Sequence, residues 1–412
     1  MKTVLAVTLL VSATLTGQPV DPQSSTGTQP VTGTWHVRLS DQWNRQDGER
    51  WVSIRMNRDS QRDYSAGMRS AELEAAGIRG EKFSGSDVRF SLNRDAGRID
   101  FHGSFDAGHG AGTFRFEPNA AFVAALRASG RQATPEDALR LAIHDVSRTF
   151  ISGIEAQGYK DVDVEDLVRM RIHGVDGPYI EAMRKAGYDK LPVDDLVKTR
   201  IHGATPDYIA GMRKAGFDRL SVEDLIKTRI HGVTAAYVAE MRTAGYDTLS
   251  IDDLVKTRIH GATPAFVQEV KAAGFDRLSV DDLVKMRIHG VTPAFIREVR
   301  DLGFKNVGID ELVRMRIHGV ATSFVKELRT LGYDNLTIDD LVKMRIHGVT
   351  PEFIREIKDL GYASVPQDRL VAFRIHGVDG AFIRDAQKAG LKDLSAEDLI
   401  DLSIHGRRWV RR

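Results

Sequence analysis

The sequence predicts a mainly α-helical protein, in which a small antiparallel β domain precedes an α-solenoid of ten 29-residue helix–turn–helix repeats. The first observation behind this prediction is a histidine that recurs every 29 residues with no inserted residue, which is typical of an array whose copies contact only their neighbours. The second is a change of hydrophobic period, from that of a helix to that of a strand, in the residues before the array. The ten histidines are His144, His173, His202, His231, His260, His289, His318, His347, His376 and His405.

The β domain is predicted to span residues 32–117. Apolar side chains alternate there with polar ones, which indicates a strand meander with one buried face. A glycine-rich stretch, 106–112, predicts the connection between the last two strands, and residues 70–76 predict a short helix. The five predicted strands are 34–39, 51–56, 88–92, 99–103 and 113–116.

The solenoid is predicted to span residues 118–406, and one copy explains the others. Thr205 caps a first helix, and Gly216 ends it in the left-handed conformation that closes many helices. Ser221 opens the second helix with an acid three residues later, a capping-box arrangement with aspartate in place of glutamate. Gly232 ends this second helix, and the cycle restarts.

Each repeat therefore consists of two short helices, which are too short to be stable alone and must stack on their neighbours. In the second helix, Val222, Leu225, Ile226 and Ile230 are predicted to line one buried face. An aromatic residue in the first turn of each first helix is predicted to fill the core. These residues are Tyr179, Tyr208, Tyr237, Phe266, Phe295, Phe324 and Phe353.

The histidines suggest a metal site, but their spacing argues against one. Two imidazoles that share a zinc ion have nitrogens within about 4 Å of each other, because each lies about 2.0–2.1 Å from the metal. Equivalent side chains in adjacent helical layers lie about 8–10 Å apart instead. We therefore predict that the imidazoles cap the carbonyl ends of the helices. A second interpretation stays open, in which histidines and arginines form a strip that binds an anionic glycan or partner and responds to mild acid.

The predicted partner-binding residues are the arginines two positions before the histidines. Acids at the start of the same helices, such as Asp252, and lysines four residues later, such as Lys256, predict neutralising pairs within each helix. The formal net charge of the chain is +1 from interspersed signs, which argues against a nucleic-acid partner. The partner-binding candidates are Arg200, Arg229, Arg258, Arg287, Arg316 and Arg345.

The two ends of the chain predict its location. Residues 1–20 have the charge, apolar run and small residues of a signal peptide, residues 21–31 have the composition of a flexible linker, and residues 407–412 form a basic tail. No later segment reaches the ~20 apolar residues of a transmembrane helix. The chain contains no cysteine, which excludes disulfides and thiolate metal sites. We expect an exported protein, periplasmic or extracellular.

Catalytic motifs are not found in the sequence. It has no zinc-peptidase His-Glu-x-x-His, no phosphate-binding glycine loop followed by lysine, and no Gly-x-Ser-x-Gly elbow. We therefore predict no catalytic residue, no cofactor and no metal, and expect a non-enzymatic scaffold that binds a protein or a cell-envelope polymer. Two alternatives stay open: an enzyme that uses His36, His102 or His109 of the β domain, and end-to-end association of copies of the chain.

The repeat resembles that of a known group of bacterial proteins. The segment 348–356, the turn Leu360-Gly361-Tyr362, and the strand 112–116 leading into Phe122 and Val123 carry the resemblance. They are similar to the helical-repeat region that follows the peptidase part in beta-lactam-sensor type bacterial membrane metallopeptidases, and to related exported repeat proteins. The resemblance covers the chain from about Gly33 onward and excludes the peptidase part with its zinc motif. It implies an extracytoplasmic sensing or interaction module, and it provides no active-site residue.

Overall fold

A computed structural model describes residues 29–44, 48–59 and 62–406. The predicted signal peptide, most of the predicted linker and the basic tail 407–412 lie outside the described residues. The chain folds as two compact units, unit 1 (residues 1–201) and unit 2 (residues 202–412). Within the described residues, no helix is both long and apolar enough to cross a lipid bilayer.

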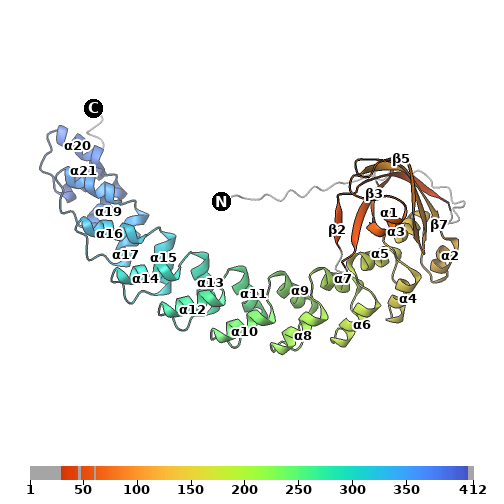
Figure 1. Cartoon of the computed structure of the whole chain (residues 1–412). Coiled ribbons are helices and arrows are strands. Elements are labelled where there is room, and N and C mark those ends of the chain that lie inside the picture. Colours follow the sequence, from red (N-terminus) through yellow and green to blue (C-terminus); the bar gives the residue numbers. More distant parts are fainter. Residues whose placement is uncertain (1–28, 45–47, 60–61, 407–412) are drawn as a thin grey trace. The chain divides into compact units, whose positions relative to one another are not determined.

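An antiparallel sheet forms the β domain of unit 1, as the sequence predicts (Figure 1). Its strand order is β2-β3-β1-β7-β6-β5, with β4 paired to β3, so β1 lies between β3 and β7 and the sheet is not a simple meander. The five predicted strands are present, whereas β2 and β4 were not predicted from the sequence. The strands are β1 (Val31–Arg38), β2 (Gln42–Asn44), β3 (Arg50–Asp59), β4 (Arg62–Arg69), β5 (Gly85–Arg94), β6 (Gly97–Asp106) and β7 (His109–Pro118).

The glycine-rich stretch 106–112 differs from the prediction. Only Ala107 and Gly108, both with positive φ, connect β6 to β7, and the rest of the stretch pairs within the sheet. A side chain would not fit at Gly112, because a Cβ there would lie 2.0 Å from the carbonyl oxygen of His102. The glycines therefore allow two strands to approach closely. The predicted short helix is confirmed as α1 (Ser70–Ala75).

Trp35 lies at the centre of the sheet's apolar face, where its ring meets Phe90 and Phe101 edge-on. A helix from the first repeat, α3 (Pro135–Ile143), packs against β1, β4, β6 and β7. The β domain and the first repeat therefore share one core, and the predicted boundary at residue 118 separates secondary-structure types within unit 1.

Ten helix pairs follow the sheet, which confirms the predicted repeat architecture. The first helices of the pairs are α2 (Ala120–Ala128), α4 (Arg148–Ala156), α6 (Gly177–Lys185), α8 (Pro206–Lys214), α10 (Ala235–Thr243), α12 (Pro264–Ala272), α14 (Pro293–Asp301), α16 (Thr322–Thr330), α18 (Pro351–Asp359) and α20 (Gly380–Lys388). The second helices are α3, α5 (Val164–His173), α7 (Val193–Ile201), α9 (Val222–Ile230), α11 (Ile251–Ile259), α13 (Val280–Ile288), α15 (Ile309–Ile317), α17 (Ile338–Ile346), α19 (Gln367–His376) and α21 (Ala396–His405).

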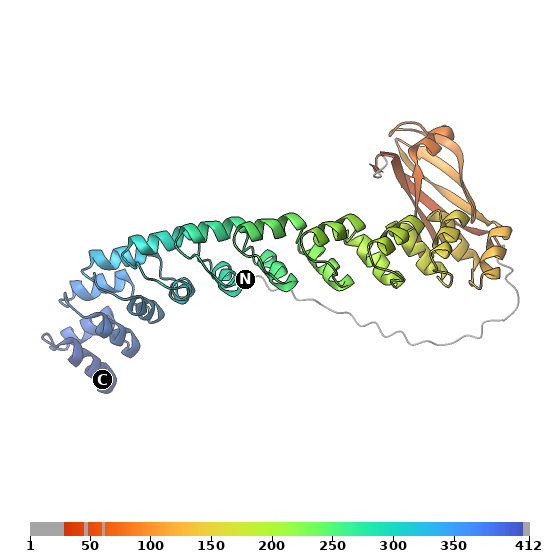
Figure 2. The ribbon, with the colours of Figure 1, turned by 90° about the horizontal axis from the view of Figure 1, so that it is seen from below.

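In unit 2 the first helices pack on one another and the second helices do likewise, so two rows run side by side (Figures 1 and 2). The predicted ends of the helices are confirmed. Thr205 accepts a hydrogen bond from the backbone of Tyr208, and Ser221 accepts one from the backbone of Asp224. Gly216 has φ +87° and Gly232 has φ +67°, the left-handed region that favours glycine.

Candidate interaction surface

The arginine before each histidine contacts the preceding repeat. In unit 2, Arg229 Nε donates to the carbonyl of His202 at 3.4 Å, and its guanidinium lies 4.9 Å from the centroid of the Tyr208 ring. The orphan carbonyl at a helix end is thus satisfied by the next repeat's arginine, which makes the contact that we predicted for the imidazole. The same stacking joins Arg200 to Tyr179, Arg258 to Tyr237, Arg287 to Phe266, Arg316 to Phe295, Arg345 to Phe324 and Arg374 to Phe353.

The glycine after each histidine provides the space for this guanidinium. A Cβ at Gly203 would lie 2.8 Å from Arg229 Nη2, and one at Gly232 would lie 2.9 Å from Arg258 Nη2. The aromatic rings under the guanidinium groups are almost all buried, as predicted for core residues. Arginine, glycine and aromatic ring from adjacent repeats therefore form one recurring joint, which combines helix capping with cation–π contact.

The structure places the six predicted partner-binding arginines singly, one in each of six successive repeats. All but Arg229 are exposed, and Arg229 is partly exposed. One face of each guanidinium rests on a ring of the protein itself. Their binding of a partner stays a prediction, but each arginine already holds two repeats together.

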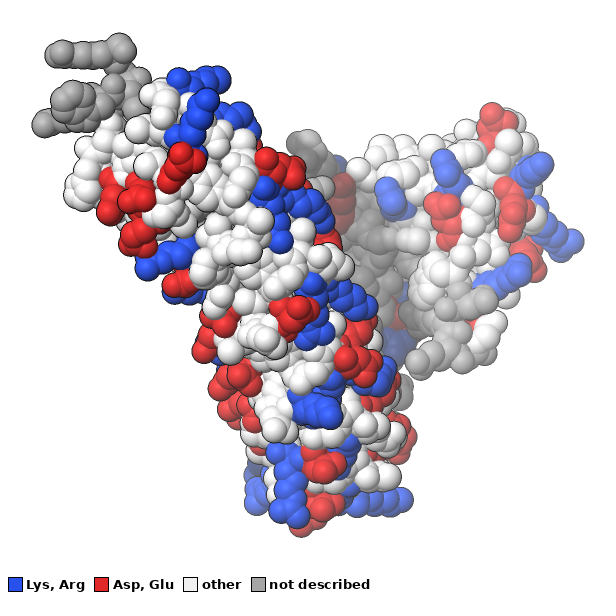
Figure 3. Space-filling model, turned by 90° about the vertical axis from the view of Figure 1, so that its left-hand side faces the viewer, with Lys and Arg blue, Asp and Glu red and all other residues white. Residues whose placement is uncertain are grey.

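The lysines also differ from the sequence prediction, because in unit 2 they pair with the next repeat. Lys227 pairs with Asp252, and Lys256 pairs with Asp281. Lys285 pairs with Asp310, whose pKa this hydrogen bond lowers. Arg314 Nη2 continues the row at 2.7 Å from Asp339. Such exposed pairs contribute little stability one by one, but together they neutralise the surface, where both signs interleave (Figure 3).

An unexpected feature of unit 2 is a row of exposed isoleucines, which we call the isoleucine ladder. Ile230 was predicted to be buried, and this is wrong, because 56% of the residue is exposed. Its equivalents are exposed to between 47% and 58%, and each lies on the next helix of the same row. The isoleucine ladder consists of Ile230, Ile259, Ile288, Ile317, Ile346, Ile375 and Ile404.

Helical geometry explains this exposure. Thr228 is fully buried, with its hydroxyl bonded to the carbonyls of Asp224 and Leu225. Ile230 follows two residues later, so at 3.6 residues per turn its side chain points about 200° away from that of Thr228. The sequence shows only a threonine at this position, and its burial is seen only in the structure. Single exposed apolar residues are ordinary, but the same position is exposed in the second helix of seven successive repeats, which gives a row of exposed apolar side chains.

A histidine follows each isoleucine and accompanies the ladder. The histidines after the first six rungs are partly exposed, and His405 is exposed. Imidazoles can donate or accept hydrogen bonds, and each histidine lies about 100° around the helix from its isoleucine. Across the described part of the chain, no group of three or more histidines, cysteines or carboxylates is placed to hold a metal ion.

The first repeat differs from the others at this position. Ile143, which corresponds to the ladder isoleucines, is only 4% exposed. It lies with Trp51, Ser65 and Gly67 of the sheet around a small cavity of about 290 Å³. In unit 1 the β domain therefore covers the first position of the series, whereas Ile172 in the next repeat is exposed.

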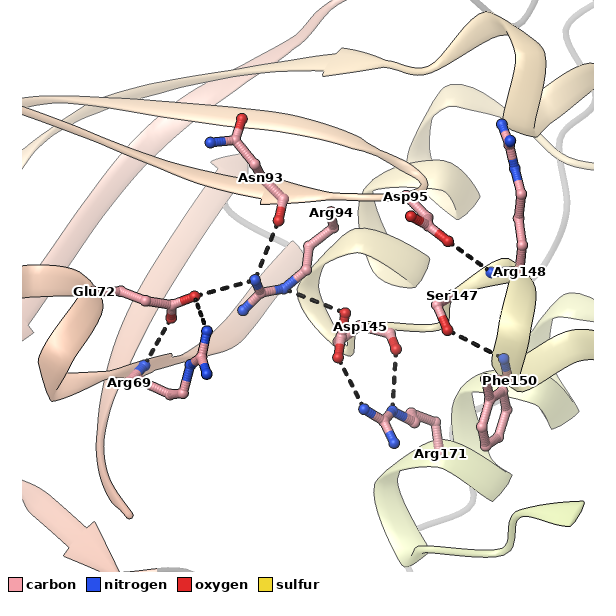
Figure 4. Close-up of polar contacts among 10 residues, drawn as sticks. All are labelled: Arg69, Glu72, Asn93, Arg94, Asp95, Asp145, Ser147, Arg148, Phe150 and Arg171. Atoms are coloured by element: carbon pink, nitrogen blue, oxygen red, sulfur yellow. Dashed lines mark hydrogen bonds and ion pairs between the residues drawn. The ribbon is translucent and has the colours of Figure 1, made fainter. Parts of the chain in front are cut away.

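Asp145 replaces the helix-ending glycine in this first repeat and connects the sheet to the helices (Figure 4). Its φ is +56°, a conformation that is costly for a residue with a Cβ. Its carboxylate lies 2.9 Å from Arg171 Nη2 and 3.5 Å from Arg94 Nε, and its carbonyl accepts from Arg171 Nε. Arg94 also donates to Glu72 of α1, which joins strand, helix and second repeat in one network.

Glu72 and His144 in this region have shifted pKa values. Burial raises the pKa of Glu72, but hydrogen bonds from Arg69 and the charge of Arg94 outweigh it, and the pKa lies below its ordinary value. Burial lowers the pKa of His144, and the charge of Arg140 lowers it further. The fold therefore favours a carboxylate at Glu72 and a neutral imidazole at His144.

The three histidines of the alternative enzyme hypothesis do not form one site. His102 Nε2 lies 2.7 Å from Asp87 Oδ1 on the open face of the sheet, and this hydrogen bond lowers the pKa of Asp87. His36 and His109 line a separate hollow of about 490 Å³. The pair at His102 is solvent-exposed, so it lacks the low-dielectric surroundings that strengthen catalytic electrostatics.

Comparison of the sequence with protein-family models and with curated proteins finds no match. The resemblance to the repeat region of beta-lactam-sensor type metallopeptidases therefore stays a prediction.

Proposed function

We propose that this protein is an exported, non-enzymatic repeat scaffold that binds a protein or a cell-envelope polymer along the isoleucine ladder. The ladder is the observation that supports this proposal. Half-exposed apolar side chains at one position of the second helix in seven successive repeats are an arrangement that solubility disfavours, and repeated apolar exposure on one side of a protein is typical of interaction surfaces.

The surroundings of the ladder also favour binding over catalysis. Lys256 and Asp252 lie three and seven residues before Ile259, on the same side of α11, and each is paired with an adjacent repeat. The arginines are engaged with aromatic rings. The exposed isoleucines are thus apolar side chains that a partner could contact between these paired charges. The predicted signal peptide and the resemblance to extracytoplasmic sensing modules support an exported role.

The test is capture of partners from an envelope extract of the source organism by the immobilised chain. Ile259, Ile288 and Ile317 are changed together to asparagine. We expect captured protein or polymer to fall at least tenfold, because truncation of an apolar anchor at an interface costs about 1 kcal/mol or more. Changing the same three residues to valine is the matched control, since valine keeps an apolar rung and capture should persist.

Folding must be unchanged for this comparison to be valid. The three positions are exposed, so each substitution should alter the free energy of unfolding by no more than about 0.5 kcal/mol. Helical circular dichroism should therefore be the same in both variants. Equal capture by the asparagine and valine variants would reject the ladder as the binding surface.

A further inference from the structure

We infer that the small cavity between the sheet and the first two repeats of unit 1 binds an uncharged sugar unit of a glycan. This site is separate from the isoleucine ladder, so the inference goes beyond the proposed function and does not depend on it. It follows from an exposed tryptophan at the cavity, from the hydrogen-bonding groups that line it, and from the balance of charge around it.

The first feature is Trp43, which is 42% exposed and is the only exposed aromatic side chain among the described residues. It is paired with Trp51 across β2 and β3, with ring centroids 6.0 Å apart and an angle of 26° between the rings. Both indoles line the cavity as a stacked pair. The C–H groups on one side of a sugar ring pack well on such a pair, because the face of an aromatic ring carries partial negative charge.

The second feature is a set of hydrogen-bonding side chains that line the same cavity. Ser53 and Ser65 share one hydrogen bond between their hydroxyls, which leaves each able to form others. Arg94 makes its hydrogen bonds through Nη1, and among the described residues none engages its Nη2 (Figure 4). Asp145 contributes a carboxylate, which accepts. Donors and acceptors thus surround one cavity, which suits the hydroxyls of a sugar, because each hydroxyl can both donate and accept.

The third feature is the charge around the cavity, which disfavours ionic ligands. Arg94 and Arg171 both pair with Asp145, and Arg94 also pairs with Glu72, so two guanidinium groups balance two carboxylates (Figure 4). The other titratable side chain of the lining, His144, is neutral because burial lowers its pKa. A charged ligand would therefore lose hydration in the cavity without gaining an unpaired opposite charge.

The size and the lining of the cavity limit the ligand further. Its volume of about 290 Å³ is close to the lower limit of about 300 Å³ for ligand pockets, which favours a single ring. Polar side chains share the lining with Trp43, Trp51 and Ile172, so a purely apolar ligand would remove water from polar groups without replacing it. A ring with one apolar side and hydroxyls at its edge matches both parts of the lining.

The conformation of Asp145 indicates that the cavity is a specific feature of the first repeat. Later repeats have glycine at this position, whereas Asp145 keeps a costly φ of +56°. Its carboxylate holds Arg94 and Arg171 at the cavity. Strained residues that position other side chains are common at ligand sites.

The experiment is isothermal titration calorimetry of the full chain at about pH 6, where amines of sugars carry a charge. The dimer of N-acetylglucosamine is the uncharged probe. The dimer of glucosamine is its matched cationic probe, digalacturonate is the anionic one, and N-acetylleucine amide is an uncharged apolar one. Because the cavity is small, we expect a Kd of about 1 mM for the uncharged dimer and at least about tenfold weaker binding of the other three.

Replacing Trp43 tests the position of the site. Trp43→Ala should weaken binding of the uncharged dimer at least about tenfold, whereas Trp43→Phe, which keeps an aromatic face, should stay within about threefold of the unmodified chain. Leu391→Ala is the matched control, because Leu391 is 41% exposed and lies outside the cavity, and its binding should be unchanged. Trp43 is exposed, so circular dichroism should be the same in all three variants.

The inference would be overturned by binding of none of the sugars, by equal binding of charged and uncharged dimers, by tighter binding of the apolar amide, or by unchanged binding in Trp43→Ala. The variant with Ile259, Ile288 and Ile317 changed to asparagine should bind the uncharged dimer as the unmodified chain does, and loss of binding there would overturn the inference as well. If this variant binds the dimer and its capture from envelope extract is unchanged, only the proposed function fails.

Discussion

The first repeat and those that follow use the same helix end for different purposes. In the first, Ile143 is buried against the sheet and Asp145 is held in a left-handed conformation by Arg94 and Arg171. In the next repeats a glycine stands at the position of Asp145, and the isoleucine is exposed. The helices are alike, so the difference lies in what covers them. Whether this isoleucine is exposed therefore depends on what packs over the helix end and not on the repeat sequence alone.

A second difference concerns the residue after the glycine that ends each first helix. In several repeats this residue is a tyrosine, such as Tyr246, whose hydroxyl donates to the carbonyl of Leu278 at 2.8 Å. In the first repeat it is Arg131, whose Nε donates to the equivalent carbonyl of Val162 at 2.7 Å. Phe217 shows that the array tolerates a residue without the hydroxyl at this position. The contact that Arg131 makes between the first two repeats thus contains more hydrogen bonds than the contact that a tyrosine makes in later repeats.

The largest expected loss of stability follows from replacing Arg131. Arg131 is buried and also donates to the carbonyl of Lys160 and to Glu155. Changing it to methionine leaves two carbonyls without their donor, at about 1–3 kcal/mol each, so the free energy of unfolding should fall by about 3–4 kcal/mol. The change Tyr246→Phe, which removes one hydrogen bond, should cost about 1 kcal/mol. If denaturant titrations gave equal losses in the free energy of unfolding for the two variants, Arg131 would not hold the first two repeats together more strongly than Tyr246 holds the later ones.

The buried and exposed isoleucines provide the next comparison. The change Ile143→Ala removes a buried side chain and should lower the free energy of unfolding by about 3 kcal/mol. The same change at Ile288, which is exposed, should alter it by no more than about 0.5 kcal/mol. Denaturant unfolding followed by circular dichroism measures both. A large loss at Ile288 would mean that the ladder contributes to folding, and its role as a free surface would be excluded.

Much of this arrangement follows from local sequence signals. Caps such as Thr205 and glycines such as Gly216 act within one turn of helix, so their effect on the backbone can be predicted from neighbouring residues alone. The arginine joint could not be predicted in this way, because Arg229 meets His202 and Tyr208 only after two repeats have stacked. For the same reason the lysines were assigned to partners in their own helix, although they pair with the next repeat.

The ladder itself was missed because a helical stripe was extended to the last residue of the helix. Ile226 and Ile230 are four residues apart, which suggested one face, but the fully buried Thr228 shows that the centre of the packed face lies elsewhere. In the sheet, β4 was missed because Arg62–Arg69 contains few apolar residues, and its pairing depends on β3. β4 follows β3 after only two residues, but the side-chain pattern of β4 alone does not identify it as a strand, because strand preference depends on the packing and pairing of the folded sheet.

Replacing the glycines beside the stacked arginines should have a smaller effect on stability, and it tests the guanidinium contact alone. Gly174 and Gly232 both have φ +67°, but a Cβ would lie 3.5 Å from Arg200 at the first and 2.9 Å from Arg258 at the second. Alanine at either should cost about 1–2 kcal/mol for the left-handed conformation. Alanine at Gly232 should cost about 0.5–1 kcal/mol more, because Arg258 must shift from the ring of Tyr237. Equal losses in thermal unfolding would show that the guanidinium contact adds nothing.

The smallest expected effect is the pH dependence of the first repeat, which involves one titrating group. Burial lowers the pKa of His144 in the folded protein. When the pH falls below the ordinary value of about 6.5, His144 therefore binds a proton in the unfolded chain before it does so in the folded chain. The contribution of His144 is therefore fully present above that pH and is lost below it. Glutamine at position 144 does not titrate, so its melting temperature should fall less steeply between pH 7 and pH 5 than that of the unmodified protein. If the melting temperatures of the two proteins changed in parallel between pH 7 and pH 5, the fold would not hold His144 in its neutral form. The first repeat would then differ from the others only in packing.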